Sequence, residues 1–263
     1  MRSARLIFLM LMAAASWAAE NAHERGKRVV NEALQAVGGK AFLAMEDRVE
    51  SGRAYSFFRQ ELQGLDLAKI YTRYVTAVAG KPSVRERQNF GKDESNGYLF
   101  NETGGWEITF RGARMLEPKK IENWNDATLR NIFYILRQRL NEPGMDIYSR
   151  GSDRYDNLPA EIVDITDARG LTVTVYFSAS SKLPVRQILK RRNPEYKDFD
   201  TEETLFAKYR DVGGGVMWPY SIRRFRNGEK VFELYSDNVQ INQSLQDNLF
   251  TLPSTLKILP PAK

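Results

Sequence analysis

The stretch from Gly151 to Leu189 constrains the fold most, because it reads as several strands joined by short turns. In its central part, apolar residues alternate with polar or aromatic ones: Leu171, Thr172, Val173, Thr174, Val175, Tyr176, Phe177 and Ser178. This period of two is typical of an antiparallel strand with one buried face. Gly170 marks the turn before this strand, and the next strand starts after Pro184. Strands in such close succession form a meander, and a meander of this size indicates a curved sheet that holds something apolar.

The N-terminus has the pattern of a secretory signal peptide. Arg2 and Arg5 form a basic region, residues 6–15 form an apolar run, and Ser16-Trp17-Ala18 offers small residues for cleavage. A membrane anchor is the alternative, but this run is shorter than the roughly 20 residues that a spanning helix needs. We therefore predict a signal peptide at residues 1–18 and a single mature domain at residues 19–263, located in the periplasm. The chain has no cysteine, so the prediction includes neither a lipid anchor nor a disulfide framework.

Helical periodicity appears in two places. Apolar residues recur at helical spacing from Glu24 to Val37, and Gly38-Gly39 provides a C-terminal stop. A second helix is predicted from about Asn125 to Asn141, with Asn125 or Asp126 as its cap. Turn residues divide the rest into strands, expected near residues 49–58, 67–78, 84–90, 96–101, 107–111, 146–149, 161–164, 171–178, 185–191, 203–212, 217–226 and 230–241. The sequence thus predicts an α+β fold dominated by one antiparallel sheet of about eleven strands.

Short motifs along the chain resemble those of the LolA-like, outer-membrane lipoprotein-sorting proteins. The motifs are residues 36–39 (AVGG), 49–52 (VESG), 97–100 (GYLF), 105–106 (GW), 176–186 (YFSASSKLPVR), 238–242 (NVQIN) and 247–253 (DNLFTLP). The resemblance extends over almost all of the mature chain, from about Glu24 to Pro253. The resemblance implies a half-barrel, which is a strongly curved, unclosed antiparallel sheet with helices across its concave face. It also implies a periplasmic carrier that holds a lipid or a lipoprotein acyl chain and exchanges it with inner- or outer-membrane partner proteins. A non-catalytic partner-binding or stress-sensing module of the envelope is the alternative.

Large apolar residues on the predicted strands and on the second helix are candidates to line such a cavity: Phe57, Tyr74, Phe100, Trp106, Leu129, Ile132, Phe133, Leu136, Tyr176, Tyr209 and Trp218. The competing interpretation is that these side chains fill a dry core, since large apolar residues usually pack in the interior.

Other classes of function receive little support from the sequence. The lone histidine, His23, stands close to the predicted cleavage point, so Ser–His and histidine-rich metal sites are absent. Two interpretations, calcium ligands and a solvated turn, are compatible with the acidic cluster of Asp198, Asp200, Glu202 and Glu203. A carboxylate-pair hydrolase is also compatible with the sequence, but no pattern favours it. Without Arg2 and Arg5 there are 37 basic and 33 acidic residues, a net charge of +4, too small an excess to indicate nucleic acid. We predict no enzyme activity, no cofactor and no metal.

Overall fold

A computed structural model describes residues 20–193 and 198–261 of the chain, so the predicted signal peptide lies outside the described residues. Within them, thirteen strands form one sheet. They are β1 (Asp47–Phe58), β2 (Glu61–Tyr74), β3 (Val84–Phe90), β4 (Asn96–Asn101), β5 (Gly104–Thr109), β6 (Gly112–Met115), β7 (Asp146–Tyr155), β8 (Leu158–Thr166), β9 (Thr172–Ser178), β10 (Pro184–Arg192), β11 (Phe199–Asp211), β12 (Met217–Arg226) and β13 (Glu229–Ile241).

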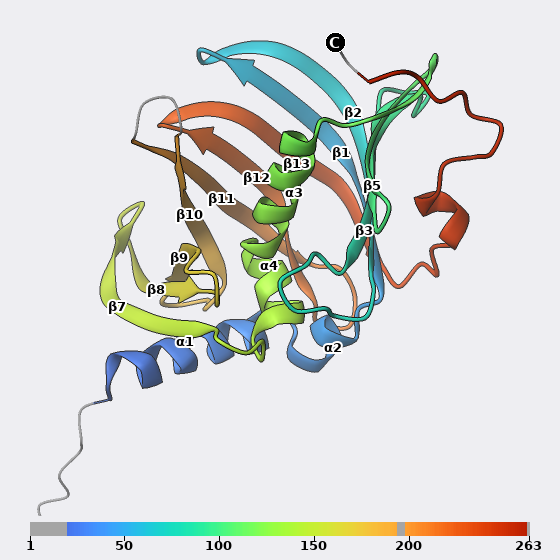
Figure 1. The fold of residues 1–263 in the computed structure, drawn as a ribbon. Helices are drawn as coiled ribbons and strands as arrows, with labels where there is room; N and C mark the ends of the chain where they lie inside the picture. The colour runs from blue at the N-terminus through green and yellow to red at the C-terminus, as the bar shows by residue number, and fades with distance from the viewer. Residues whose placement is uncertain (1–19, 194–197, 262–263) are drawn as a thin grey trace, which may run out of the picture.

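The sheet is antiparallel throughout and runs in the order β6-β5-β4-β3-β2-β1-β13-β12-β11-β10-β9-β8-β7. The strands at its two ends, β6 and β7, do not pair with each other, so the sheet stays open. It curves around the helices that follow β6, as Figure 1 shows. The predicted α+β fold with a curved, unclosed sheet is confirmed, although the sheet has thirteen strands instead of about eleven.

Two differences from the predicted strands have a local cause. The turn between β1 and β2 uses Arg59 and Gln60, both with positive φ angles of 49° and 65°, so the turn has no glycine to mark it. As a result β2 begins at Glu61, six residues before the predicted start at Leu67. The four-residue strand β6 was missed because it is shorter than the usual strand and follows β5 after only two residues.

The helices are α1 (Ala22–Ala36), α2 (Gly39–Ala44), α3 (Pro118–Leu129), α4 (Ile132–Tyr134), a π-helical turn (Ile135–Arg139) and the 3₁₀ helix η2 (Asp247–Phe250). The first predicted helix is confirmed as α1, which begins with a capping box formed by Asn21 and Glu24 and lies along β7. A Cβ atom at Gly26 would come 3.0 Å from the backbone nitrogen of Ser149, tighter than an ordinary contact, so glycine favours this close approach of α1 to β7. Gly38, with a φ angle of 124°, ends α1 as predicted, and α2 follows at once.

The second predicted helix was wrong in its start and in its continuity. Helix α3 begins earlier, at Pro118, because proline is favoured in the first helical turn. It ends at Leu129, and Asn131 caps α4 by accepting hydrogen bonds from the backbone N–H groups of Phe133 and Tyr134. The spacing of apolar residues continues across this break, and for that reason periodicity alone predicted one continuous helix.

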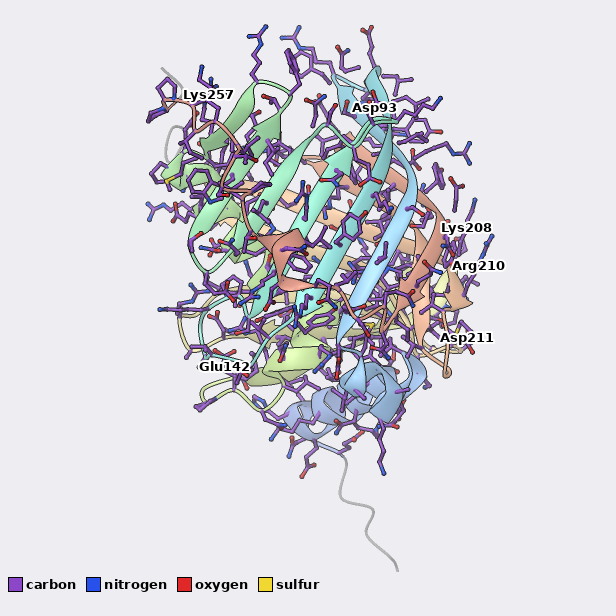
Figure 2. All side chains as sticks on the ribbon, turned by 90° about the vertical axis from the view of Figure 1, so that its right-hand side faces the viewer. Asp93, Glu142, Lys208, Arg210, Asp211 and Lys257 are labelled. Carbon is purple, nitrogen blue, oxygen red and sulfur yellow. The ribbon has the colours of Figure 1, made fainter. Side chains whose placement is uncertain are left out.

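The two faces of the sheet are covered differently. The main apolar core lies on the concave face, where α1, α4 and the π-helical turn pack against the sheet. On the convex face the C-terminal segment crosses β3 and β4, as Figure 2 shows, and Phe250 of η2 packs there with Leu99 and Ile108. The backbone N–H of Leu259 also donates a 2.7 Å hydrogen bond to the carbonyl of Ala113 in β6.

Candidate functional site

Helix α3 crosses the concave side of the sheet and is attached near one wall by an aromatic stack. Trp124 lies parallel to Phe100 of β4, with ring centroids 4.4 Å apart and an interplanar angle of 1°. The indole N–H of Trp124 also donates a 3.3 Å hydrogen bond to Glu86 of β3. Whereas α1 runs along β7, α3 lies along no strand. It therefore spans the concave side instead of lying flat on the sheet.

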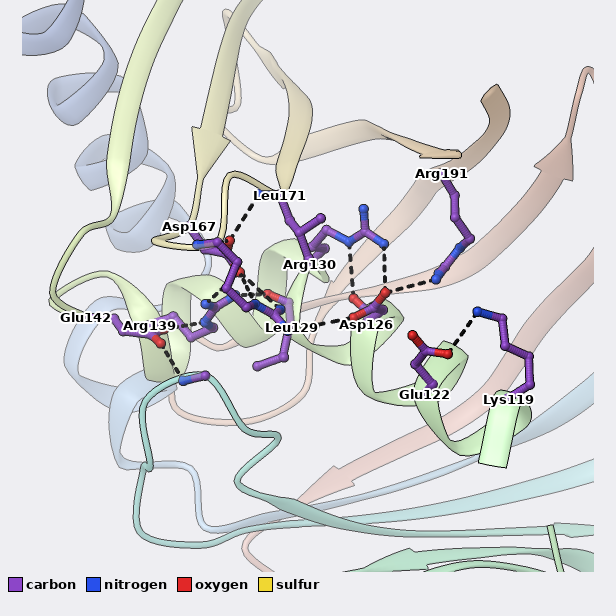
Figure 3. Close-up of polar contacts among 12 residues, drawn as sticks. Lys119, Glu122, Asp126, Leu129, Arg130, Arg139, Glu142, Asp167, Leu171 and Arg191 are labelled. Carbon is purple, nitrogen blue, oxygen red and sulfur yellow. Dashed lines mark hydrogen bonds and ion pairs between the residues drawn. The ribbon is translucent and has the colours of Figure 1, made fainter. Parts of the chain in front are cut away.

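The opposite side of α3 is attached to the other wall by charges, as Figure 3 shows. Asp126 is 3.0 Å from the Arg191 guanidinium of β10 and 3.6 Å from that of Arg130. Arg130 is only 3% exposed, and burial lowers the pKa of its guanidinium. Arg169 also lies 4.0 Å from this carboxylate, so three arginines share it, and through Arg191 Asp126 holds α3 and β10 together.

The break after α3 is fixed by a second polar group in Figure 3. Arg139, 4% exposed, donates a 2.5 Å hydrogen bond to the carbonyl of Leu129 and pairs with Glu142 and with Asp167 at 3.3 Å. Burial raises the pKa of Asp167, but hydrogen bonds from the backbone of Leu171 and from Arg169 outweigh burial and keep this pKa lowered. The side chain of Arg139 thus satisfies a carbonyl at the C-terminus of α3 that has no helical partner.

Below this break, the predicted cavity residues of α4 lie in a packed core. Phe133 is 3% exposed, and its ring centroid is 4.7 Å from that of Trp218, 5.2 Å from that of Phe206 and 6.4 Å from that of Tyr209. The Tyr209 hydroxyl donates a 2.5 Å hydrogen bond to the carbonyl of Pro184. Leu129, Ile132 and Leu136 are also buried. The structure brings these six predicted residues into the interior, where they pack against protein.

The other predicted residues are spread over both faces. Tyr74 and Phe100 lie on the concave side, next to α4 and α3 respectively. Phe57, Trp106 and Tyr176 lie on the convex face and do not line the concave side, which corrects the sequence-based expectation. The reason is the alternation of the strands: Trp106 packs in the convex cluster with Phe250, and Tyr176 points away from its buried neighbours Val175 and Phe177. Phe57 lies under the Lys230 ammonium group, at 4.0 Å.

An apolar surface that the sequence analysis missed lies on the concave face next to the packed core, and Ile222 contacts both. We call it the upper concave face, and it consists of Ala54, Ala68, Ile70, Phe90, Ile222, Phe232 and Leu234, together with Arg224. Ile70, Phe90, Ile222 and Phe232 are only half-buried, so part of this surface is open to water. The signal for it in the sequence was the alternation of β1, β2, β12 and β13. In this cluster Ala54, Ala68 and Leu234 are buried by the larger, half-buried side chains around them.

A pocket lies elsewhere, between the end of β2 and the π-helical turn. It has a volume of about 590 Å³ and a polar lining that includes Arg73, Arg85, Arg137 and Asp247. Arg73 and Arg85 both pair with Asp247, at 2.6 and 2.8 Å. Arg137 donates a 2.9 Å hydrogen bond to the carbonyl of Met45, and burial lowers the pKa of its guanidinium. The three arginines and Asp247 in this pocket are therefore already bound to groups of the protein itself.

Among residues 20–193 and 198–261, no three histidine or acidic side chains are grouped so as to hold a metal ion. In the same part of the chain, no helix is both long and apolar enough to cross a membrane.

The sequence matches no protein-family model and no curated protein. Its structure is similar to that of a protein from Vibrio parahaemolyticus described as an outer-membrane lipoprotein-sorting protein domain, with a TM-score of 0.58 at 11% identity over 87% of this chain and 97% of the other. It is also similar to a DUF1329 family protein from Desulfovibrio piger, with a TM-score of 0.59 at 12% identity over 86% and 97% of the two chains. The chain therefore has a LolA-like fold.

Proposed function

We propose that this LolA-like chain is a carrier protein of the periplasm that holds a lipid or a lipoprotein acyl chain on its upper concave face. The observation that supports this most is the combination of a half-buried apolar surface, which includes Ile222 and Phe232, with a helix that spans the space beside it. An ordinary core covers such side chains completely, as around Phe133.

The energetics of this site agree with a role in carrying lipids. Burial of an acyl chain stabilises a complex by about 0.8 kcal/mol per CH₂ group. About ten buried CH₂ groups would supply roughly 8 kcal/mol before the costs of association are subtracted. The apolar surface alone can thus give useful affinity, and no catalytic group or cofactor is part of the proposal.

Export and exchange complete the proposed role. Residues 1–18 act as a cleaved signal peptide, and residues 19–263 form one carrier domain without a lipid anchor. The domain exchanges its ligand with proteins of the inner or outer membrane. N-terminal sequencing of the exported protein should begin at Ala19, and a start at Met1 would contradict the predicted cleavage.

The carrier role is tested by native mass spectrometry and lipid extraction on the protein purified from a bacterial periplasm. We expect a co-purifying species of lipid mass, and we expect Ile222→Asp to lose it because a charge would then face the acyl chain. Leu67→Asp is the matched control, since Leu67 is exposed on the convex face of the same sheet. A wild-type protein without lipid, which also shows no thermal shift with phospholipids or lipopeptides, would contradict the carrier role and favour a partner-binding scaffold.

A further inference from the structure

One arginine on the upper concave face stands out from its neighbours. Arg224 lies two residues after Ile222 on β12 and opposite Phe232 of β13, so all three side chains share the apolar surface. Its guanidinium carbon is 5.3 Å from the centre of the Phe232 ring. A charge is thus placed among the side chains that would contact an acyl chain.

The position of Arg224 is within the curve of the sheet and yet open to water. The surrounding protein lowers the pKa of its guanidinium, and the carboxylates of Glu86, Glu202 and Glu50 act in the opposite direction. These carboxylates come from β3, β11 and β1, on both sides of Arg224 in the sheet. Nevertheless the residue is exposed. Both facts fit a side chain that projects from the sheet into an accessible space between its walls.

No carboxylate among the described residues forms an ion pair with Arg224, because those around it have other partners. Glu202 pairs with Arg191 at 3.1 Å, and Glu50 with Arg48 at 3.5 Å. Glu86 accepts hydrogen bonds from Gln88 and from Trp124 instead, at 2.5 and 3.3 Å.

A second arginine on the same face of β12 makes the contrast clear. Arg226 is 2.5 Å from Asp200, although it lies only two residues further along the strand. The same face thus offers a carboxylate partner to Arg226 but not to Arg224. The N–H donors of the Arg224 guanidinium therefore stay available for a ligand.

We propose that Arg224 binds the anionic head group of the ligand, a carboxylate or a phosphate, while the acyl chain lies over Ile222 and Phe232. This inference rests on the proposed carrier function. The guanidinium fork matches both kinds of anion by forming two parallel hydrogen bonds, which a lysine cannot do. The aromatic ring of Phe232 contacts the guanidinium and can hold it in place.

The test compares three ligands that share a twelve-carbon chain and differ in their head groups: laurate, dodecyl phosphate and dodecanol. Binding of each is measured by titration to the mature wild-type protein, to Arg224→Gln and to Arg224→Lys. The matched control is Arg223→Gln, which removes the same charge from the adjacent residue on the opposite face of β12. Thermal melting of each variant checks that the fold is retained.

We expect Arg224→Gln to weaken the binding of an anionic ligand roughly 10- to 100-fold, as expected for the loss of hydrogen bonds to a charged group. Its affinity for dodecanol should stay within about twofold of wild type, Arg224→Lys should be intermediate, and Arg223→Gln should match wild type. The anion that loses more affinity identifies the head group as a carboxylate or a phosphate.

The inference is overturned if Arg224→Gln reduces the affinity for the anionic ligands no more than Arg223→Gln does, or if it reduces the affinity for dodecanol by the same factor. In either case the wild-type protein still binds the chain, and the carrier function stands. If the wild-type protein binds none of the three ligands, the carrier function fails, and the role of Arg224 fails with it.

Discussion

Replacement of Phe133 by alanine decides whether α4 fills the core or lines a cavity. The side chain is 3% exposed and packs against the rings of Phe206, Trp218 and Tyr209. Truncation of a buried phenylalanine costs about 3–5 kcal/mol, the sum of the lost transfer free energy and the cavity that remains. For a domain of this size each kcal/mol lowers Tm by about 2–4 °C, so we expect Phe133→Ala to lower Tm by roughly 6–20 °C.

The matched control is Phe232→Ala on the upper concave face. Phe232 is half-buried, so its truncation should cost only about 1 kcal/mol and lower Tm by about 2–4 °C. It should instead weaken lipid binding, because Phe232 lies in the proposed site.

The assay is urea denaturation followed by circular dichroism, at constant m-value, together with lipid titration of both variants. The reasoning is refuted if Phe133→Ala lowers the free energy of unfolding by less than about 1 kcal/mol, well below the range for a buried phenylalanine, and also abolishes lipid binding. That result would mean that the ring already borders an empty space and that α4 lines the ligand site.

Three further predictions test other parts of the fold. Glu50→Gln should lower the free energy of unfolding by about 3–5 kcal/mol in urea denaturation, because Glu50 is 2% exposed and its loss leaves a buried arginine without its carboxylate; an unchanged midpoint would contradict this. Gly52→Ala should lower the free energy of unfolding by about 1–3 kcal/mol, because its Cβ would lie 2.1 Å from a carbonyl oxygen of β13. Gly64→Ala meets only a serine hydroxyl at 2.9 Å and should cost less. Equal decreases of Tm in the two variants would count against the close approach at Gly52. Hydrogen bonds, first of all from Asn227, lower the pKa of Asp200 to about 2. Its contribution to stability is therefore complete above the unfolded pKa near 4 and is lost as the pH falls towards 2. Between about pH 4 and pH 2 the Tm of Asp200→Asn should fall less than that of wild type, and parallel Tm profiles would refute the assignment.

Local sequence patterns predicted strands well where turns carry clear signals. The predicted bounds of β3, β4 and β12 agree with the structure, because glycine, proline or asparagine residues border these segments. The helix predicted from Asn125 was wrong at both its start and its middle. Its apolar spacing is real, but Asn131 interrupts the helix by capping α4. The sequence alone does not distinguish an asparagine that caps a new helix from one inside a longer helix.

The candidate site depended on information that local patterns do not contain. Alternation in a strand states which residues share a face, but both faces of this sheet carry apolar side chains, so it does not say which face is concave. Trp106 and Tyr176 were assigned to the wrong face for this reason. Leu129 and Phe133 were assigned to the helix that covers the sheet, and their burial agrees with that assignment.

The sequence by itself determined an α+β chain with a large antiparallel sheet and a first helix that stops before Gly38, because propensity, alternation and turn chemistry act between near neighbours. Only the tertiary structure decided that Phe133 fills a core while Phe232 stays half-open, since the first packs against residues more than seventy positions away in the chain. The same holds for Arg224, whose surroundings come from β1, β3, β11 and β13. Among the described residues it has no carboxylate partner, because the curved sheet brings these strands around it in an arrangement that the spacing of residues along one strand does not reveal.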